Sequence, residues 1–294
     1  MDVIPVVKVG IALLVLLFAA RSDWKTRMAS DVYWVGLGGL GMLFLAVGIL
    51  LDGVSILYLL FLIPLGVIFF DTFWERKGMF EDGINPVPVG LYIGSFVILA
   101  ALILLFWESS YLWQLMTILF MFVFIILLYQ FNIIKGGADA KALLALSILF
   151  PSYPIIDSLP LISIPVHVPQ YAFPFSLLIL FNAALLTIIV PIGMFFYNLA
   201  KGSRKLPVMF FGYKLTVSEA RKKFVWPLEY LVEDRRKVTI IPKTMDSYEG
   251  VYDELEKSGA DTIWVTPKIP FLIPITISIL FSSIVGNLIL LFVH

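Results

Sequence analysis

The sequence predicts an all-α polytopic membrane bundle of about eight transmembrane helices, with a small cytoplasmic α/β insert before the last helix. Hydrophobic residues make up 60% of the 294 residues, and the mean hydropathy is +0.97. Only 14% of the residues are charged, against about 25% in soluble domains. More than half of these charges gather in one late segment. A membrane body with one charged insert follows from these three observations.

Apolar runs long enough to cross a bilayer, about 17 to 25 residues, recur along the chain. They are residues 4–20, 34–51, 54–70, 89–107, 112–134, 140–162, 172–199 and 270–292. The sixth run is interrupted by Pro151, Pro154, Asp157 and Pro160, so its helix is expected to stop near Phe150.

The basic residues predict the orientation, because Lys and Arg are retained on the cytoplasmic side of a membrane. With the N-terminus outside, 20 of the 21 basic residues fall in cytoplasmic segments, and only Lys8 lies on the other side. One missed span would invert every later segment and destroy this asymmetry. We therefore expect a multi-pass protein of the cell (plasma) membrane, in contact with the lipid bilayer.

Three parts are expected: residues 1–200 as a transmembrane domain, 201–268 as a small cytoplasmic α/β domain, and 269–294 as a C-terminal transmembrane helix. The second part carries 13 basic and 10 acidic residues. Its Thr216-Val217-Ser218-Glu219 stretch is a capping-box pattern that opens a helix. The next predicted elements are a strand at 237–242, a helix at 247–258 that ends at Gly259, and a strand at 262–266, which together suggest a β-α-β core. No nucleic-acid-binding signature occurs there, so we predict an accessory or docking domain and no nucleic-acid partner.

A carboxylate and an ammonium stand where the chain enters the sixth run, in the sequence Gly136-Gly137-Ala138-Asp139-Ala140-Lys141. Ionisable groups at membrane depth are costly, and they indicate a functional site when a partner exists. Gly136 and Gly137 have no Cβ, so the backbone can bend and a peptide can approach Asp139. The alternative is that the glycines end the fifth helix and Asp139 only caps the sixth.

Asp23, which follows the first run, is the candidate partner of Asp139. Four predicted helices separate the two residues, and this even number returns the chain to the same cytoplasmic face. Two carboxylates within hydrogen-bonding range cannot both ionise, so one can accept a proton from water while the other donates to a carbonyl oxygen. This chemistry requires no metal, nucleophilic side chain or cofactor. The alternative for Asp23 is a solvated loop acid that Lys25 and Arg27 balance.

Several neighbouring charges have simpler interpretations. Asp31 competes with Asp23 but is expected to cap the second helix. Lys25, Arg27 and Lys141 are expected to be topology anchors, with a secondary role in tuning the aspartates or binding lipid phosphate. The only histidines, His167 and His294, map to the external side, which argues against a histidine triad or a zinc site at the cytoplasmic face.

The Asp23-x-Lys25-x-Arg27 loop and the Gly136-to-Asp139 stretch resemble the archaeal preflagellin peptidases of the type IV prepilin peptidase family, which are GxGD aspartic membrane proteases. The resemblance implies that Asp23 and Asp139 are catalytic. Ala138 departs from the family pattern, which has glycine before the second aspartate. A further departure is an extra pair of helices between the aspartates. Residues 173–182, 211–214 and 264–270 look archaeal in type and extend the resemblance over most of the chain.

The resemblance implies an aspartic endopeptidase that removes short basic leader peptides, the class III signal peptides, from preflagellin (archaellin) and type IV pilin-like precursors. Both aspartates would act at the cytoplasmic face, where a basic leader is retained. The glycines and Lys25, Arg27 and Lys141 would shape the site or bind substrate. Two alternatives remain: a non-enzymatic transporter or assembly factor, and a presenilin-like intramembrane protease.

Overall fold

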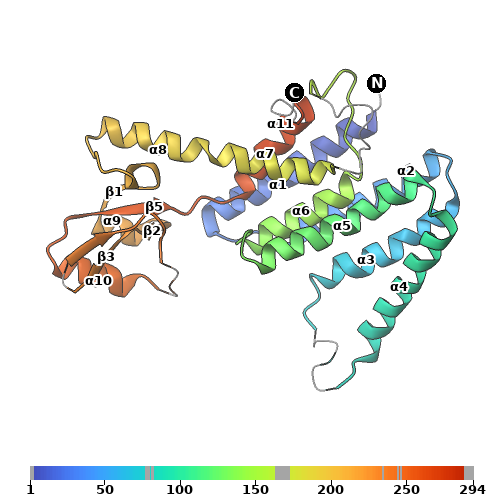
Figure 1. The fold of residues 1–294 in the computed structure, drawn as a ribbon, viewed down its shortest axis with the longest axis horizontal. Coiled ribbons are helices and arrows are strands. Elements are labelled where there is room, and N and C mark those ends of the chain that lie inside the picture. The colour runs from blue at the N-terminus through green and yellow to red at the C-terminus, as the bar shows by residue number, and fades with distance from the viewer. Residues whose placement is uncertain are drawn as a thin grey trace. The chain divides into compact units, whose positions relative to one another are not determined.

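The computed structural model describes residues 3–76, 80, 83–162, 173–233, 235–243, 245 and 247–287. The chain divides into two compact units, Met1–Ala183 with Pro270–His294, and Ala184–Ile269. The first unit is helical, and the second holds all the strands of the described sheets (Figure 1). His167 and His294 lie outside the described residues.

The first unit contains eight α-helices and one 3-10 helix among its described residues, with α7 running into the second unit. They are α1 (Val3–Thr26), α2 (Asp31–Leu51), η1 (Ile56–Phe61), α3 (Leu62–Asp71), α4 (Pro86–Phe106), α5 (Ser110–Gln130), α6 (Gly137–Leu149), α7 (Phe175–Thr187) and α11 (Leu272–Ile284). In the second unit, α8 (Ile189–Ala200) follows directly.

Five stretches of the described chain are long and apolar enough to cross a membrane, and they make this a multi-pass membrane protein. They are Val3–Thr26, Asp31–Leu51, Pro86–Phe106, Ser110–Gln130 and Phe175–Ala200. The predicted spans at 54–70, 140–162 and 270–292 are shorter as helices, so the expected number of eight is not confirmed. As the prolines predicted, α6 ends at Leu149, because Pro151 restricts the backbone of Phe150.

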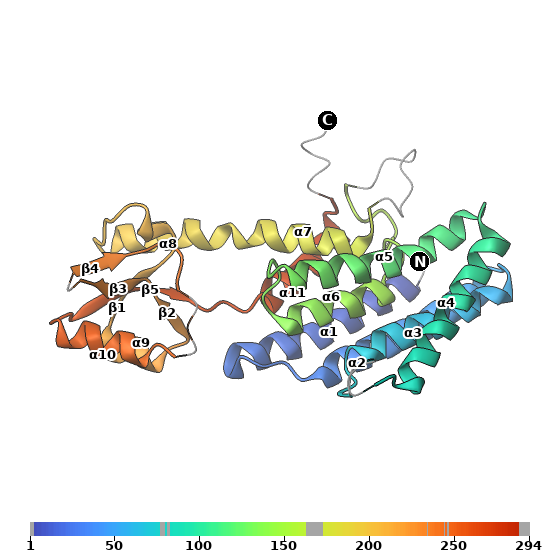
Figure 2. The same ribbon diagram turned by 60° about the horizontal axis from the view of Figure 1, so that its bottom comes forward.

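Helix α6 lies at the centre of the first unit. It packs most extensively against α2, and it also contacts α5, α1 and α11; both views show it running beside α5 (Figures 1 and 2). Every residue from Asp139 to Leu149 except Lys141 is buried. Gly41 of α2 makes the close approach possible, since a Cβ there would meet the backbone nitrogen of Leu149 at 2.9 Å. Small residues commonly allow such helix contacts in membranes.

The second unit contains two small antiparallel sheets. β1 (Tyr213–Thr216) and β2 (Val225–Pro227) flank β5 (Thr262–Pro267), and β3 (Glu229–Val232) pairs with β4 (Arg235–Val238). Short η3 (Val208–Phe210) precedes β1, and α9 (Val217–Lys222) and α10 (Glu249–Lys257) lie together along one side of the strands (Figure 2). The core comprises apolar side chains of β1, β5, α9 and α10, including Leu215, Ala220, Leu255, Ile263 and Val265.

The predicted capping box is confirmed. Thr216 is the N-cap of α9, its hydroxyl accepts from the backbone of Glu219, and the Glu219 carboxylate accepts from the backbone of Thr216. These hydrogen bonds to Thr216 lower the pKa of Glu219. The predicted β-α-β core is wrong, because β4 and β5, the strands on either side of α10, belong to different sheets. β5 pairs with β1 and β2, and β4 pairs with β3. The sequence interpretation did not include β1, β2 or β3.

Candidate active site

Asp23 is held on the last turn of α1, and the predicted loop around it is helical as far as Thr26. The chain then turns at Arg27, whose φ is 59°, and the Arg27 amide donates to the Asp23 carbonyl oxygen at 2.9 Å. The hydroxyls of Ser22 and Thr26 donate to the carbonyl oxygen of Met28, at 3.0 and 3.1 Å. These hydrogen bonds close the turn, so Asp23 stands on an ordered support.

Asp139 lies in the first turn of α6, with 8% of its surface exposed. The N-cap residue is Gly136, and no side chain makes a capping hydrogen bond there. The Oδ1 atom of Asp139 is buried and has no hydrogen-bond partner among the described residues. Asp139 therefore does not act as a capping side chain, although a negative charge at this position would suit the positive end of the helix dipole.

Gly136 provides the room that the Asp139 side chain occupies. A Cβ at Gly136 would collide with the Oδ2 atom of Asp139. At Gly137, a Cβ would have only the hydroxyl of Tyr129 nearby, at an ordinary 3.6 Å. Gly136 is therefore needed to accommodate the Asp139 side chain. The approach of a substrate peptide at this bend stays a prediction.

The structure brings Asp23 and Asp139 into electrostatic range of each other. Helix α1 contacts α6, and the charge of Asp23 acts on the buried Asp139 carboxyl group. Arg27 offsets part of this negative potential, because its own charge acts on Asp23. The arrangement has a half-buried carboxylate at the end of α1, a buried one at the start of α6, and a cation beside the first.

Lys141 and Asp31 form an ion pair that sequence reasoning missed. The Nζ atom of Lys141 donates to both carboxylate oxygens of Asp31, at 2.7 and 2.8 Å, and lies 4.9 Å from the centre of the Phe73 ring. The expected capping role of Asp31 is wrong, because Ser30 is the N-cap of α2 and accepts from the Val32 amide. The ion pair joins the start of α2 to the first turn of α6.

The other predicted site residues lie close in sequence but differ in exposure. Lys25 is exposed, whereas Arg27 is partly buried with its guanidinium 5.8 Å from the centre of the Trp24 ring. Their roles in a site stay predictions. Among the residues that the structure describes, no three His, Cys, Asp or Glu side chains gather to hold a metal ion.

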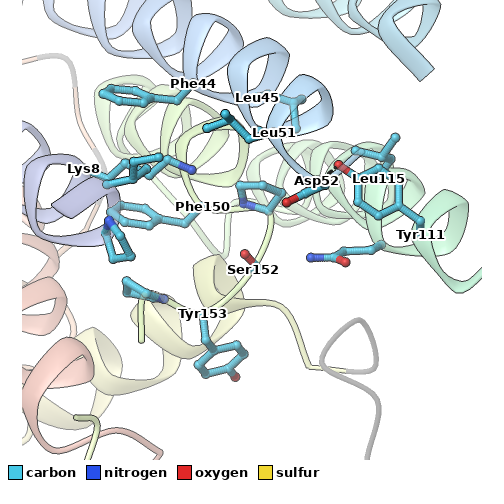
Figure 3. Close-up of a pocket in the computed structure, with 16 residues that line it drawn as sticks. Lys8, Phe44, Leu45, Leu51, Asp52, Tyr111, Leu115, Phe150, Ser152 and Tyr153 are labelled. Carbon is cyan, nitrogen blue, oxygen red and sulfur yellow. Dashed lines mark hydrogen bonds between the residues drawn. The ribbon is translucent and has the colours of Figure 1, made fainter. Parts of the chain in front are cut away.

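A pocket of about 360 Å³ lies at the opposite ends of α1 and α2 from this carboxylate pair. Lys8, Asp52, Tyr111 and Ser152 line it, together with apolar side chains such as Phe150 (Figure 3). The Tyr111 hydroxyl donates to Asp52 at 2.9 Å. Asp23 lies 15 positions after Lys8 on α1, about 22 Å along the helix, and neither aspartate of the pair lines this pocket.

The C-terminal part of the chain points to a class of enzyme. Residues 204–288 match the family described as Archaeal Peptidase A24 C-terminus Type II. The match lies in a chain whose described residues include five apolar stretches long enough to cross a membrane. These two findings point to a membrane-bound peptidase.

Similar proteins specify the family. A preflagellin peptidase of Methanococcus voltae is 34% identical over 178 residues, covering 58% of this chain and 72% of that protein. A preflagellin peptidase of Methanocaldococcus jannaschii is 28% identical over 180 residues, covering 57% and 70%. An uncharacterized protein of the same organism is 28% identical over 272 residues, covering 89% and 86%. The chain belongs to the preflagellin peptidase family.

Proposed function

We propose that this protein is an aspartic endopeptidase in which Asp23 and Asp139 together hydrolyse one peptide bond. The observation that carries the proposal is the Asp139 carboxyl group, which is buried, lacks a partner at Oδ1, and lies within range of the Asp23 charge. A buried and unpaired carboxyl group costs folding free energy, which favours a functional explanation over a structural one. Membership of the preflagellin peptidase family supports the same reaction class.

The mechanism needs the pair to share one proton, as repelling carboxyl groups at short range do. The ionised carboxylate takes a proton from water while the water oxygen attacks the scissile carbonyl carbon. The protonated carboxyl group donates to the carbonyl oxygen at the same time. The tetrahedral intermediate then collapses, the C–N bond breaks, and the amine leaves with a proton. Metal ions and organic cofactors have no role in this scheme.

We further propose that the substrates are preflagellin and type IV pilin-like precursors with short basic leaders. Positively charged leaders are held on the cytoplasmic side, so the scissile bond would lie at the cytoplasmic interface. The predicted topology puts Asp23, Asp139 and residues 201–268 on that side. The names of the relatives in Methanococcus voltae and Methanocaldococcus jannaschii support preflagellin as one substrate.

The test is cleavage of a purified preflagellin by the detergent-solubilised protein, followed by mass spectrometry. Asp23→Asn and Asp139→Asn should each lower the rate by roughly 10²–10⁴-fold, the range that acid–base groups contribute. Asp52→Asn, at the other end of the bundle, should cleave normally. Full activity in either of the first two variants would refute the aspartate pair. An unchanged substrate mass with the unaltered protein would favour the transporter or assembly-factor alternative.

A further inference from the structure

A surface of the second unit combines exposed cations with exposed isoleucines. These residues lie on a strand and the loop after it, so the exposure of the isoleucines is not that of a lipid-facing membrane helix. We define the 235–243 surface as Arg235, Lys237, Ile240, Ile241 and Lys243. Its sequence from 235 to 243 contains four basic residues and no acidic one. All five defining side chains are exposed. The surface therefore offers positive charge and apolar area side by side.

The cations share one face of the β3–β4 hairpin. Arg235 and Lys237 are two residues apart on β4, so their side chains point to the same face. Lys237 stands opposite Tyr230 of β3, and the Nζ atom of Lys243 lies 4.7 Å from the centre of the Tyr230 ring. Arg236 points to the other face, where it donates to the buried Glu229 at 2.9 Å. Three positive charges thus remain on one side of the hairpin.

The isoleucines are presented by an ordered loop. Ile241 has 71% of its surface exposed and Ile240 has 42%. Thr239 fixes the backbone before them, since its amide donates to Leu228 at 2.8 Å and its hydroxyl donates to the carbonyl oxygen of Ile241 at 2.9 Å. After them, the Lys243 amide donates to the Tyr230 hydroxyl at 2.8 Å. An ordered loop that exposes two large aliphatic side chains indicates a binding surface.

The 235–243 surface is linked to the segment that precedes the last described helix. The Tyr248 hydroxyl donates to the Lys243 carbonyl oxygen at 2.7 Å, and the Nζ atom of Lys268 lies 5.6 Å from the centre of the Tyr248 ring. In the sequence, Lys268 is four residues before Leu272, the first residue of the apolar helix α11. The 235–243 surface is therefore connected through Tyr248 to the segment that leads into an apolar helix.

We propose that the 235–243 surface binds anionic lipid, with Arg235, Lys237 and Lys243 contacting phosphate groups while Ile240 and Ile241 enter the interfacial layer. Basic residues beside exposed aliphatic ones are the usual composition of segments that lie on a membrane surface. A protein partner is the competing occupant, and the experiment separates the two. This inference holds independently of the reaction proposed for the aspartates.

The chain contains no cysteine, so a single introduced thiol reports on one position. Ile241→Cys, labelled with a polarity-sensitive fluorophore, is placed in nanodiscs that contain lipid with a nitroxide near the headgroup. With phosphatidylglycerol present, we expect strong quenching and a blue-shifted emission. With phosphatidylcholine alone, we expect much weaker quenching. Glu254→Cys, at an exposed position of α10, should be quenched in neither lipid.

A charge-removal series makes the test specific. In the Ile241→Cys background, Arg235→Gln with Lys237→Gln should lower the ratio of bound to free loop by about 25-fold, or about fivefold per charge. Lys222→Gln with Lys257→Gln removes two exposed charges elsewhere in the unit and should leave the quenching unchanged. The proposal is overturned by equal quenching at positions 241 and 254, or by quenching insensitive to Arg235 and Lys237. A third outcome also overturns the proposal: the label at position 241 is quenched neither by the nitroxide lipid nor by a quencher dissolved in water. In that case a protein covers the surface.

Discussion

At the residue scale, the buried carboxyl group of Asp139 lowers the stability of the first unit. Leaving its buried Oδ1 atom without a partner costs about 1–3 kcal/mol of stability. The neighbouring glycine is part of the same feature, because only a residue without a Cβ leaves room for the Asp139 side chain. Under the proposed mechanism, this loss of stability accompanies a carboxyl group that is positioned for proton transfer.

Gly136 and Gly137 are expected to differ in their tolerance of a side chain, because only Gly136 lies against the Asp139 carboxyl group. Gly136→Ala should displace the Asp139 carboxyl group and lower cleavage by about 10²-fold, since displacements of about 1 Å reduce catalysis by that much. The backbone of Gly136, with φ −92° and ψ 119°, accepts alanine without strain. Gly137→Ala is the matched control and should cleave within about threefold of the unaltered protein, since it adds only an ordinary contact with Tyr129. Equal losses in both variants would mean that Gly136 has no special relation to Asp139.

At the element scale, the pair of Lys141 and Asp31 connects the segments that carry the two aspartates. Lys141 follows Asp139 by two residues on α6, and Asp31 begins α2 just after the turn that follows Asp23. Both side chains are partly exposed, so the ion pair itself contributes about 0–1 kcal/mol to stability. Its main effect is expected to be on the placement of α6 against the α1–α2 turn.

A charge exchange tests this placement. Asp31→Lys and Lys141→Asp should each lower kcat by about tenfold while the melting temperature changes little. The double variant restores an opposite-charge pair and should regain most of the activity. No recovery in the double variant would show that the two residues act separately, and a large loss of melting temperature in either single variant would point to a structural role.

The same elements show where sequence reasoning stops. Asp23, Asp139 and the glycines could be proposed as site residues because a charge beside an apolar run is a local signal, and the confirmed capping box at Thr216 is local as well. Lys141 and Asp31 are 110 positions apart, and the sequence around either residue does not predict that the two pair. Strand pairing in the second unit is equally non-local, so the segments at 237–242 and 262–266 suggested one core while the strands joined different sheets.

At the scale of the whole molecule, the predicted number of membrane spans was limited by how poorly hydropathy reports helix length. Hydropathy located each apolar run, but the proline-rich stretch after Phe150 and the short α11 show that an apolar run and a helix can differ in length. The orientation rests on the basic residues alone, and it stays a prediction of the sequence.

Cysteine scanning in intact cells tests that orientation. Lys25→Cys and Glu254→Cys should be protected from a membrane-impermeant maleimide, whereas Asp52→Cys should be labelled, because Asp52 follows α2 at the end away from the α1–α2 turn. All three positions are exposed, so differences in labelling report on the side of the membrane. Labelling at position 25 with protection at position 52 would reverse the assignment.

The shortness of α6 has a consequence for the insulating layer of the membrane. A helix of 13 residues is about 20 Å long, whereas the hydrocarbon layer of a bilayer is about 30 Å thick. The pocket lined by Lys8, Asp52 and Ser152 adjoins the end of α6 at Phe150 and provides polar groups there. In the predicted topology, the low-dielectric barrier along α6 would therefore be thinner than a full bilayer, and the transmembrane voltage would fall over that shorter distance, ending close to Asp139.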